Sequence, residues 1–344
     1  MAYTTIDDPS AHFQVITYSG SSDSTLAVTN DGNSDLQPDF VWIKNRNDTG
    51  NHSLVDSSRG VNKVIHSNAT TAEADQDSRG YLSAFSSDGF TVSDGSTDGI
   101  DVKENAKTYV AWQWKANGGS ATASASESGD NPAYSTQANT TAGFSIVTYT
   151  GTGANGTVTH SLGGTPEAII IKNRDRVDDW ATYWHKGYSN PQNYAFKFNS
   201  TASATAYDDD TAFNDTAPTS TVFSVGSANM TNTDGENIVA YCFRSIQGYS
   251  RIGSYVGNGE TDGTFIYTGF KPAFVMMKNA STTGWWNIND IKRPGYNPTN
   301  DMLAAQSSNA EADEDAIDLL SNGFKQRSTG GDPNGNGETI IYMA

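Results

Sequence analysis

The sequence holds a single cysteine, Cys242, so no disulfide can form within the chain and no cysteine pair can bind a metal. Cys242 lies in an apolar, strand-like stretch, where the expected role is that of a small core residue. No apolar run approaches the roughly 20 residues of a membrane-spanning helix. The first residues also lack the basic and apolar regions of a signal peptide. These absences predict a protein that folds in a cytoplasm and does not insert into a membrane.

Basic residues are scarce. Lys and Arg together number 21 against 39 Asp and Glu, which gives a formal net charge of −18. A surface of this charge repels a phosphate backbone, so the composition argues against a nucleic-acid partner. It favours solubility and leaves cation binding open.

Signatures of catalysis are missing as well. The five histidines have no metal-ligand spacing: His12, His52, His66, His160 and His185. No serine lies in a G-x-S-x-G turn, and the glycine-rich stretch 151–156 lacks the Lys-Ser/Thr of a phosphate loop. We therefore expect no enzyme. A polysaccharide-cleaving carboxylate pair stays a distant alternative, because such a pair is defined in space and not by sequence separation.

What the chain does contain is a strand that occurs three times with the same internal spacing. Each copy begins with proline, continues with apolar residues and ends with Lys-Asn. The copies are Pro38–Asn45, Pro166–Asn173 and Pro272–Asn279. Because apolar residues stand at consecutive positions, we expect each strand to be central, with its outer face covered by a loop, a helix or a neighbouring repeat. The sequence thus predicts an internally repeated protein.

Short apolar stretches and frequent turn residues surround each copy, which predicts an all-β protein of three tandem antiparallel β-sandwich repeats, lectin-like or jelly-roll-like. A closing strand recurs at 109–114, 238–243 and 340–344. We expect an N-terminal arm at 1–12, repeats at 13–116, 144–247 and 248–344, and a low-complexity linker at 117–143. The third copy stops short of the aromatic residue that matches Trp114 and Phe243. We therefore expect this chain to end inside its last strand.

Two further expectations concern local structure and packing. The only stretch that suggests a helix runs from Ala310 to Leu320, since Asn309 could cap it and Gly323 follows it. The short junction at 245–248 predicts that repeats two and three form one rigid body. Repeat one would then dock separately through its long linker.

Acidic residues at alternate positions form the sharpest chemical signal. They occur in two matching stretches, with Glu73, Asp75 and Asp77 in the first repeat and Glu311, Asp313 and Asp315 in the third. Carboxylates spaced in this way could converge on Ca²⁺ from a loop, but the spacing differs from that of an EF-hand. A solvated acidic loop is the favoured interpretation, and Ca²⁺ as a bound ion stays the alternative. We expect no other cofactor.

Aromatic residues gather in one strand of repeats two and three. Trp184, His185 and Trp285 are candidates for a platform on which sugar rings could stack. Filling of the core by the same rings is the favoured alternative.

Several long strings resemble a family of repeated structural proteins of marine tailed phages. The strings are Tyr3–Ser10, Val41–Arg46, Asp56–Gly60, Tyr109–Ala116, Gly143–Gly151 and Gly269–Val275. They extend over nearly the whole chain. The resemblance brings no catalytic or binding residues that could be transferred to this sequence.

The resemblance implies a bacteriophage virion structural protein, with a tail fibre or fibre-like appendage that contacts the host surface as the first expectation. A capsid or tail decoration or connector protein is the alternative, and a polysaccharide-active tailspike is a distant third. The implied partners are other virion proteins, further copies of the chain in a homo-oligomer and a host surface glycan. The protein would be assembled in the host cytoplasm and released by lysis as part of the virion.

Overall fold

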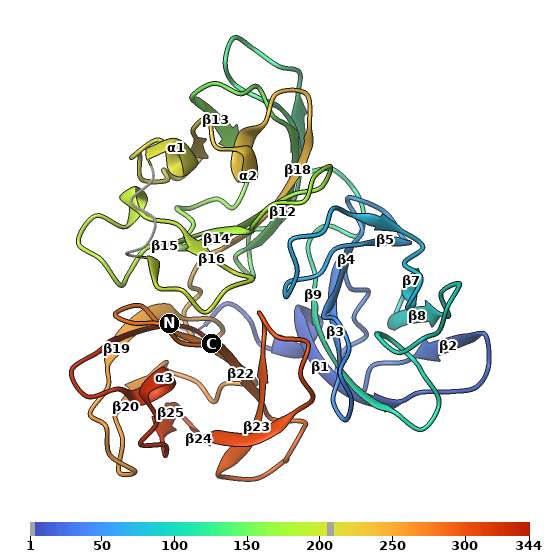
Figure 1. The fold of residues 1–344 in the computed structure, drawn as a ribbon, viewed down its shortest axis with the longest axis vertical. Helices are drawn as coiled ribbons and strands as arrows, with labels where there is room; N and C mark the ends of the chain where they lie inside the picture. Colours follow the sequence, from blue (N-terminus) through green and yellow to red (C-terminus); the bar gives the residue numbers. More distant parts are fainter. Residues whose placement is uncertain (1–3, 205–209) are drawn as a thin grey trace.

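The computed structural model describes residues 4–204 and 210–344, with all side chains except those of Asp210, Asp315 and Ala316. The prediction of an all-β fold is confirmed, because antiparallel sheets form nearly all of the regular structure. Figure 1 shows three lobes, arranged around a common centre. We call them unit 1 (13–116), unit 2 (117–247) and unit 3 (248–344). None of the helices in the described part of the chain is long and apolar enough to cross a lipid bilayer.

Unit 1 is a sandwich of two sheets with strand orders β1-β9-β3-β4 and β2-β8-β7, and a short pair β5-β6. The arm before it carries the short 3-10 helix η1 (Pro9–Ala11). Its strands are β1 (Phe13–Ser19), β2 (Thr25–Val28), β3 (Phe40–Asn45), β4 (Ser53–Asp56), β5 (Lys63–Val64), β6 (Ala74–Asp75), β7 (Tyr81–Ser86), β8 (Gly89–Ser93) and β9 (Thr108–Trp114).

Unit 2 contains the sheet β10-β11-β12-β18-β14-β15-β16 and the pair β13-β17. Its strands are β10 (Ala123–Ala125), β11 (Ala133–Asn139), β12 (Phe144–Thr150), β13 (Gly156–Thr159), β14 (Ala168–Asn173), β15 (Ala181–Trp184), β16 (Phe196–Lys197), β17 (Val222–Val225) and β18 (Asn237–Phe243). Its helical turns are η2 (Pro191–Asn193), α1 (Asp210–Phe213) and α2 (Asn229–Asn232).

Unit 3 forms one curled sheet with the order β19-β26-β21-β22-β23-β24-β25-β20. Its strands are β19 (Ile252–Val256), β20 (Phe265–Tyr267), β21 (Phe274–Asn279), β22 (Trp286–Asp290), β23 (Thr299–Ala304), β24 (Ala312–Leu320), β25 (Gly323–Gln326) and β26 (Thr339–Met343), with the helical turn α3 (Gly331–Asn334). The arrangement of first strand, closing strand, Pro-to-Asn strand and following strand therefore occurs in each unit: β1-β9-β3-β4, β12-β18-β14-β15 and β19-β26-β21-β22.

The two faces of each Pro-to-Asn strand serve different cores. In β3, Val41 and Ile43 point into the core of unit 1, whereas Phe40 and Trp42 point into a larger cluster shared by all three units. The strands β14 and β21 divide their residues in the same way. Neighbouring units therefore cover the outer face, as one of the sequence-based alternatives predicted.

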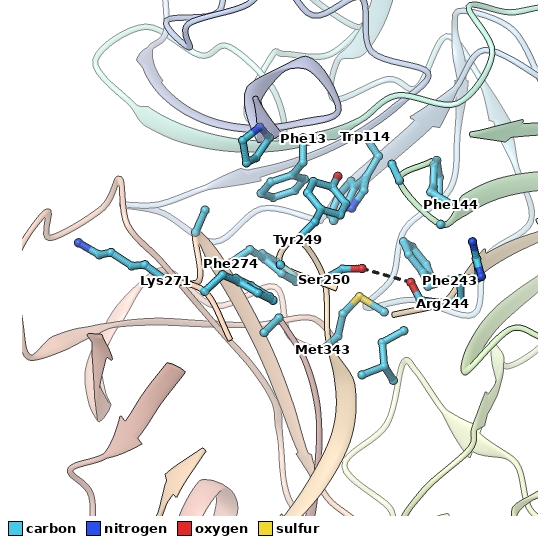
Figure 2. A pocket seen from close by; sticks show the side chains of 18 residues that line it. Phe13, Trp114, Phe144, Phe243, Arg244, Tyr249, Ser250, Lys271, Phe274 and Met343 are labelled. Atoms are coloured by element: carbon cyan, nitrogen blue, oxygen red, sulfur yellow. Dashed lines mark hydrogen bonds between the residues drawn. The ribbon is translucent and has the colours of Figure 1, made fainter. Parts of the chain in front are cut away.

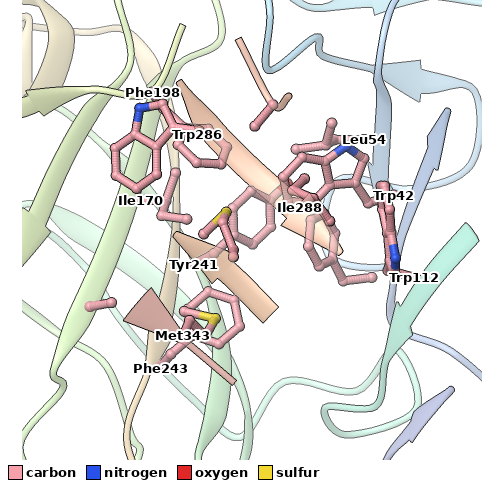
Figure 3. Packing of buried hydrophobic residues seen from close by; sticks show 14 of the residues in the cluster. Trp42, Leu54, Trp112, Ile170, Phe198, Tyr241, Phe243, Trp286, Ile288 and Met343 are labelled. Atoms are coloured by element: carbon pink, nitrogen blue, oxygen red, sulfur yellow. The ribbon is translucent and has the colours of Figure 1, made fainter. Parts of the chain in front are cut away.

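The shared cluster, which we call the central core, is rich in aromatic rings (Figure 3). Trp112 and Trp286 are fully buried in it, and Trp42 lies with its ring centroid 5.4 Å from that of Trp112. Trp286 packs edge-on against Phe198 of unit 2 at 5.0 Å. Large rings bury much apolar surface, so this core holds the three lobes together.

The predicted helix at 310–320 is wrong, because β24 occupies this stretch. Ile317 and Leu319 are both buried, a period of two that suits a strand, and β24 pairs with β23 and β25. Ser321 and Asn322 form the two-residue turn between β24 and β25, and Leu320 pairs with Gly323 across it. Pairing with neighbouring strands has overridden the helix signals of the sequence.

The predicted linker at 117–143 is not a free tether. Its second half is β11, whose seven residues all pair with β12, and β10 pairs in turn with β11. This edge strand was not predicted because it consists mainly of small and polar residues, which give no hydrophobic strand pattern. Unit 1 also contributes Phe40, Trp42 and Trp112 to the central core. The expectation that unit 1 docks apart from a rigid pair of units 2 and 3 is therefore not met.

Candidate functional site

The candidate site is the junction of the three units, where hydrogen bonds and buried charged side chains from all three meet. A loop after each Pro-to-Asn strand donates a backbone hydrogen bond to the next unit around the centre. The three bonds are Gly50 N to Ser308 O at 3.0 Å, Asp178 N to Thr70 O at 2.9 Å and Gly284 N to Thr201 O at 2.9 Å. Each unit thus gives one bond and receives one, so the contacts close into a ring.

The lysine of each Pro-to-Asn strand is buried at this ring. Lys44, Lys172 and Lys278 are all 0% exposed. Lys172 donates to Thr70 O of unit 1 at 3.1 Å, and Lys278 donates to Thr201 O of unit 2 at 2.7 Å. Burial lowers the pKa of each of the three ammonium groups to about 8. The Lys-Asn pair of each strand is therefore buried at the centre of the molecule.

The first acidic stretch is divided among separate cations. Glu73 accepts from Arg59 at 2.8 Å and from Arg174 of unit 2 at 2.8 and 2.9 Å. Asp75 lies 3.1 Å from Lys63 on the surface. Because each carboxylate turns to its own partner, the three carboxylates of this stretch do not converge on one ion. Glu73 instead joins units 1 and 2.

The second acidic stretch behaves in the same way. Glu311 accepts from Arg46 of unit 1 at 2.8 and 3.1 Å and from Arg293 at 3.0 Å. Asp313 is exposed and accepts from Asn300. The side chain of Asp315 lies outside the described part. Glu311 therefore joins units 3 and 1, and the favoured interpretation as solvated loops fits neither Glu73 nor Glu311.

A fully buried ion pair supports each of these bridges. Asp56 and Arg59 are paired at 2.5 Å with both side chains 0% exposed, and Tyr241 of unit 2 donates to Asp56 at 2.7 Å. In unit 3, Asp290 and Arg293 are paired at 2.8 Å. Here Trp112 of unit 1 donates through Nε1 to Asp290 at 3.0 Å. An aromatic donor from a neighbouring unit thus completes each buried pair.

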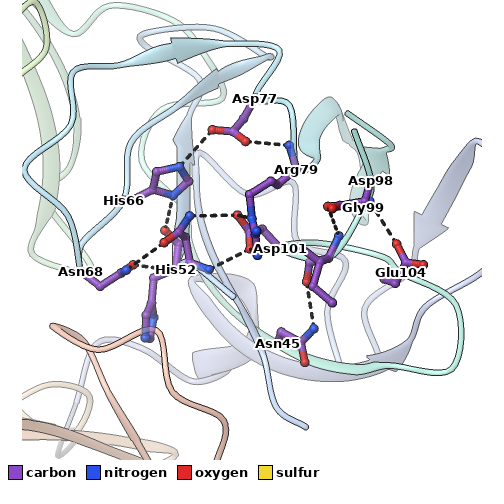
Figure 4. Close-up of polar contacts among 12 residues, drawn as sticks. Asn45, His52, His66, Asn68, Asp77, Arg79, Asp98, Gly99, Asp101 and Glu104 are labelled. Carbon is purple, nitrogen blue, oxygen red and sulfur yellow. Dashed lines mark hydrogen bonds and ion pairs between the residues drawn. The ribbon is translucent and has the colours of Figure 1, made fainter. Parts of the chain in front are cut away.

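One group among the described residues has the spacing of metal ligands, namely His66, Asp77 and Asp101 (Figure 4). Its polar atoms are already engaged. His66 Nε2 donates to Asp77 at 3.0 Å, and His66 Nδ1 donates to His52 O at 2.9 Å. Arg79 lies 3.2 Å from Asp101. The arrangement is an ion-pair network, and of the acidic candidates only Asp77 belongs to it.

The pKa values of two neighbouring histidines, His66 and His52, are shifted in opposite directions. Burial alone would lower the pKa of His66, but the hydrogen bond and the charge of Asp77 outweigh it, so the pKa of His66 is raised. The pKa of His52 is well below its usual value because the ring is buried and Lys44 is close. His52 Nδ1 accepts from Trp42 at 2.8 Å, so Nε2 carries the proton and donates to Ala304 O of unit 3 at 3.0 Å.

The proposed sugar platform does not form on Trp184. This ring is 1% exposed and lies in the central core, 5.9 Å from Trp286. Core filling, the favoured alternative, is therefore correct for Trp184. His185 is half-buried, with Nε2 3.2 Å from Ile252 O of unit 3, and Trp285 is half-buried with its backbone amide bonded to Asp332. The three candidates do not present one face to solvent.

An apolar pocket of about 150 Å³ opens at one end of the central core (Figure 2). All three units line it, with Phe13 and Trp114 from unit 1, Phe144 from unit 2 and Phe274 from unit 3. Arg244 and Lys271 are the basic side chains among its described lining residues, and Tyr249 lines it as well. The pocket has the shape and lining to hold an apolar group, and no Asp or Glu is among the described residues that line it.

The cationic partners were missed by the sequence reasoning. Arg59 and Arg293 stand at the same distance after the Lys-Asn of their repeats, and Arg46 and Arg174 directly follow it. Comparison of the repeats could therefore have singled them out. Which carboxylate each contacts depends on the packing of the units.

A search of curated proteins and a search of solved structures each return no match for this chain. A family model does match, over residues 8–344, and its description reads domain of unknown function (DUF7483). Because this match extends over nearly the whole sequence, the chain belongs to the DUF7483 family.

Proposed function

We propose that the protein is a non-enzymatic structural component of a tailed-phage virion, in the first place a tail fibre or fibre-like appendage that contacts the host surface. The source of the phage assignment is the resemblance of the long sequence strings described above. The structure adds support of a different kind, which concerns the role of the polar groups.

The observation that carries the structural role is the use of the buried charges. The groups that could have formed a reactive site, Glu73, Glu311, Asp77 and His66, each have a cationic or anionic partner. Two of these partners come from another unit. A catalytic acid or base needs access to a substrate, whereas Glu73 and Glu311 each bridge two units, and His66 and Asp77 pair with each other inside unit 1.

A second candidate is a decoration or connector protein with a purely architectural role. The arrangement of three lobes around one core favours it, because a single chain of this shape could occupy a position of threefold symmetry in a larger particle (Figure 1). Both candidates have other virion proteins or further copies of the chain as partners. The host glycan belongs to the first candidate alone.

The remaining parts of the proposal follow from charge and from the resemblance. A net charge of −18 supports the expectation that the protein does not bind nucleic acid. Assembly in the host cytoplasm and release by lysis are implied by the virion role. If the protein binds Ca²⁺, the ion would bind to carboxylates on the surface, because Glu73 and Glu311 are already paired with arginines.

The test is to locate the protein on purified particles. An antibody against the purified chain, coupled to gold, is imaged on virions by electron microscopy. Label on the tail or its appendages supports the first candidate, and label on the capsid supports the second. Particles without label, and without the protein by mass spectrometry, contradict both. Release of reducing sugar from host polysaccharide, lost when one acid is changed to its amide, would show an enzyme.

A further inference from the structure

Unit 2 carries two strands that have no counterpart in the described parts of units 1 and 3. Strands β10 and β11 continue its sheet beyond β12, whereas the sheets of units 1 and 3 end at the equivalent strands β1 and β19. The added strands reach unit 1, because Gln137 of β11 donates to the hydroxyl groups of Ser57 and Ser58 at 3.0 and 2.9 Å. Unit 2 therefore extends its sheet against the loop that follows β4.

A groove of about 290 Å³ lies in the corner between this loop and the extended sheet. Ser135 of β11 and Thr148 of β12 lie opposite each other on its floor, and Thr150 lies two residues farther along β12 on the same face. Ser58 lines the groove from the side of unit 1. We call it the hydroxyl groove after these four side chains. Its volume is close to the lower end of the roughly 300–1,000 Å³ of small-molecule sites, so it suits one small ligand.

Several polar groups of the hydroxyl groove have no partner within the described part of the protein. The hydroxyl groups of Ser135 and Thr150 form no hydrogen bond with any described residue. The same holds for Nη1 of Arg174, whose other side-chain nitrogens donate to Glu73. A hydroxyl group can donate and accept at the same time. The groove thus offers donors and acceptors side by side, a pattern that a polyhydroxylated ligand matches.

The charges around the hydroxyl groove are balanced. Arg59 and Arg174 are the cations of its lining, and none of the described lining residues is acidic. Glu73 pairs with both arginines, and Asp56 pairs with Arg59. Two carboxylates therefore offset two guanidinium groups, so a further anion gains little Coulomb energy here. The free N–H group of Arg174 acts as a donor to a neutral oxygen.

The groove is fixed before any ligand arrives. Its floor belongs to the paired strands β11, β12 and β18, and the hydrogen bonds of Gln137 hold the loop of unit 1 against it. The bridge between Glu73 and Arg174 joins the same two units at 2.8 Å. A ligand therefore meets groups that are already in place, which reduces the entropy cost of binding.

We propose that the hydroxyl groove binds one neutral sugar residue of a surface glycan. The hydroxyl groups of the sugar donate to and accept from Ser135 and Thr150, and one of its oxygens accepts from Nη1 of Arg174. A sugar presents such groups on adjacent carbons, whereas an apolar group or a lone anion would leave hydroxyl groups of the floor unsatisfied. The inference rests on the host-contacting role proposed above and gives that role a site and a ligand class.

The test is an NMR titration of the intact protein, labelled at its tyrosine rings, with the methyl glycosides of glucose, galactose and mannose. Tyr134 lines the groove and reports from it, and Tyr296 of unit 3, which is 75% exposed, is the internal control. We expect at least one of these sugars to shift the Tyr134 signal in a saturable way and to leave Tyr296 unchanged. The dissociation constant should lie in the millimolar range, as is usual for so small a ligand. The matching uronate should bind about three-fold or more weakly, because the groove has no unpaired cation.

Two variants place the binding in the groove. Thr150→Val keeps the shape of the side chain and removes one hydroxyl group without a protein partner, so the fold is kept and binding should weaken about three- to ten-fold. Thr17→Val is the matched control, since Thr17 occupies on β1 the place that Thr148 holds on β12. Ala133→Phe puts a ring into the groove, because Ala133 lines it opposite Thr150, and should abolish the Tyr134 shift.

Four results would each overturn the sugar site. They are no Tyr134 shift with any of the three glycosides, a uronate that binds as tightly as its neutral sugar, unchanged binding in Thr150→Val, and a shift that persists in Ala133→Phe. These results are independent of the location of the protein. Gold label on the tail without sugar binding overturns this site alone, and sugar binding by a protein absent from the particles overturns the virion role alone.

Discussion

The contact between units 1 and 2 and the contact between units 2 and 3 use equivalent strands, but only the first contains buried ion pairs among the described residues. Between units 1 and 2, the buried pair Asp56–Arg59 meets Tyr241, and Glu73 meets Arg174. Between units 2 and 3, aromatic rings meet, and the polar contacts are hydrogen bonds such as that from Lys278 to Thr201 O. One geometry of repeat packing therefore tolerates either an ion-pair network or an apolar contact.

The difference can be traced to two positions of the repeat. Where units 1 and 3 carry Asp56 and Asp290, unit 2 carries Trp184, and where unit 1 carries Arg59, unit 2 carries Gly187. A Cβ on Gly187 would lie 3.1 Å from Ile341 Cγ2 of unit 3, and its φ of +102° disfavours other residues. The backbone of unit 2 at Gly187 therefore lies so close to unit 3 that an arginine side chain would not fit at this position. A buried charge is costly unless all its partners are present, whereas an apolar contact requires only that the side chains fit together in shape and volume.

The largest effect is expected at the apolar contact. Trp286→Ala removes a fully buried ring that packs on Trp184, Phe196 and Phe198. The free energy of unfolding should fall by about 4 kcal/mol, as measured by urea denaturation. The neighbouring Trp285→Ala is the control, since this ring is half-buried, and it should cost clearly less. An equal loss in both variants would contradict the packing described.

The next effect tests the charged contact. Arg59→Met keeps an apolar stem but leaves Asp56 and Glu73 without their shared cation. We expect a loss of about 3 kcal/mol in the free energy of unfolding, because a buried charge stays uncompensated. Arg293→Met should behave alike at the contact of units 3 and 1. If both variants are as stable as the parent in urea, the charged network does not support the fold.

A smaller effect should appear at the buried lysines and depend on pH. Lys278→Met removes the donor to Thr201 O and Gly284 O and should cost about 1–2 kcal/mol at pH 7. Burial lowers the pKa of Lys278 from 10.5 to about 8. Between these values the unfolded chain binds more protons than the folded one, so the contribution of Lys278 to stability rises with pH.

The measurement is urea denaturation of parent and variant at pH 7, 8 and 9. The difference between the two should grow above pH 8, by up to about 1.4 kcal/mol per pH unit. Lys325→Met is the control, because this lysine pairs with Asp262 on the surface. A difference that does not change with pH would show that Lys278 keeps an ordinary pKa.

A weaker pH dependence is expected for the network in unit 1. The hydrogen bond and charge of Asp77 raise the pKa of His66 against the effect of burial, so the stability that His66 contributes is complete below pH 6.5 and lost as pH rises through the raised pKa. His66→Gln should therefore cost about 1 kcal/mol at pH 5.5 and less at pH 9. His160→Gln, in unit 2, should not show this dependence, because burial lowers the pKa of His160. A constant cost of His66→Gln at both pH values would argue against a charged His66.

The smallest effect is expected at the rim. Lys292 of unit 3 reaches Asp31 of unit 1 at 2.8 Å, and the two side chains are 34% and 56% exposed. Lys292→Ala should change the free energy of unfolding by less than about 1 kcal/mol, and less still at high salt. Asp31→Ala is the matched variant. A larger loss would mean that rim charges also hold the units together.

The sequence by itself determined the all-β class and the central strand of each unit. The spacing from proline to asparagine set the central strand, and its apolar residues at consecutive positions required two covered faces. The closing strands and the burial of Cys242 could be predicted for the same reason, since both depend on a local pattern of hydrophobic residues.

Only the tertiary structure decided how the units meet and what their charges do. The stretch 312–320 carries helix signals but forms a strand because β23 and β25 pair with it, and the low-complexity stretch 133–139 forms a strand because β12 offers an open edge. Nothing in the sequence around Glu73 indicates which cations it pairs with, yet in the structure it lies between Arg59 and Arg174. Hydrogen bonds and ion pairs across units join residues far apart in the chain, so no local pattern contains them.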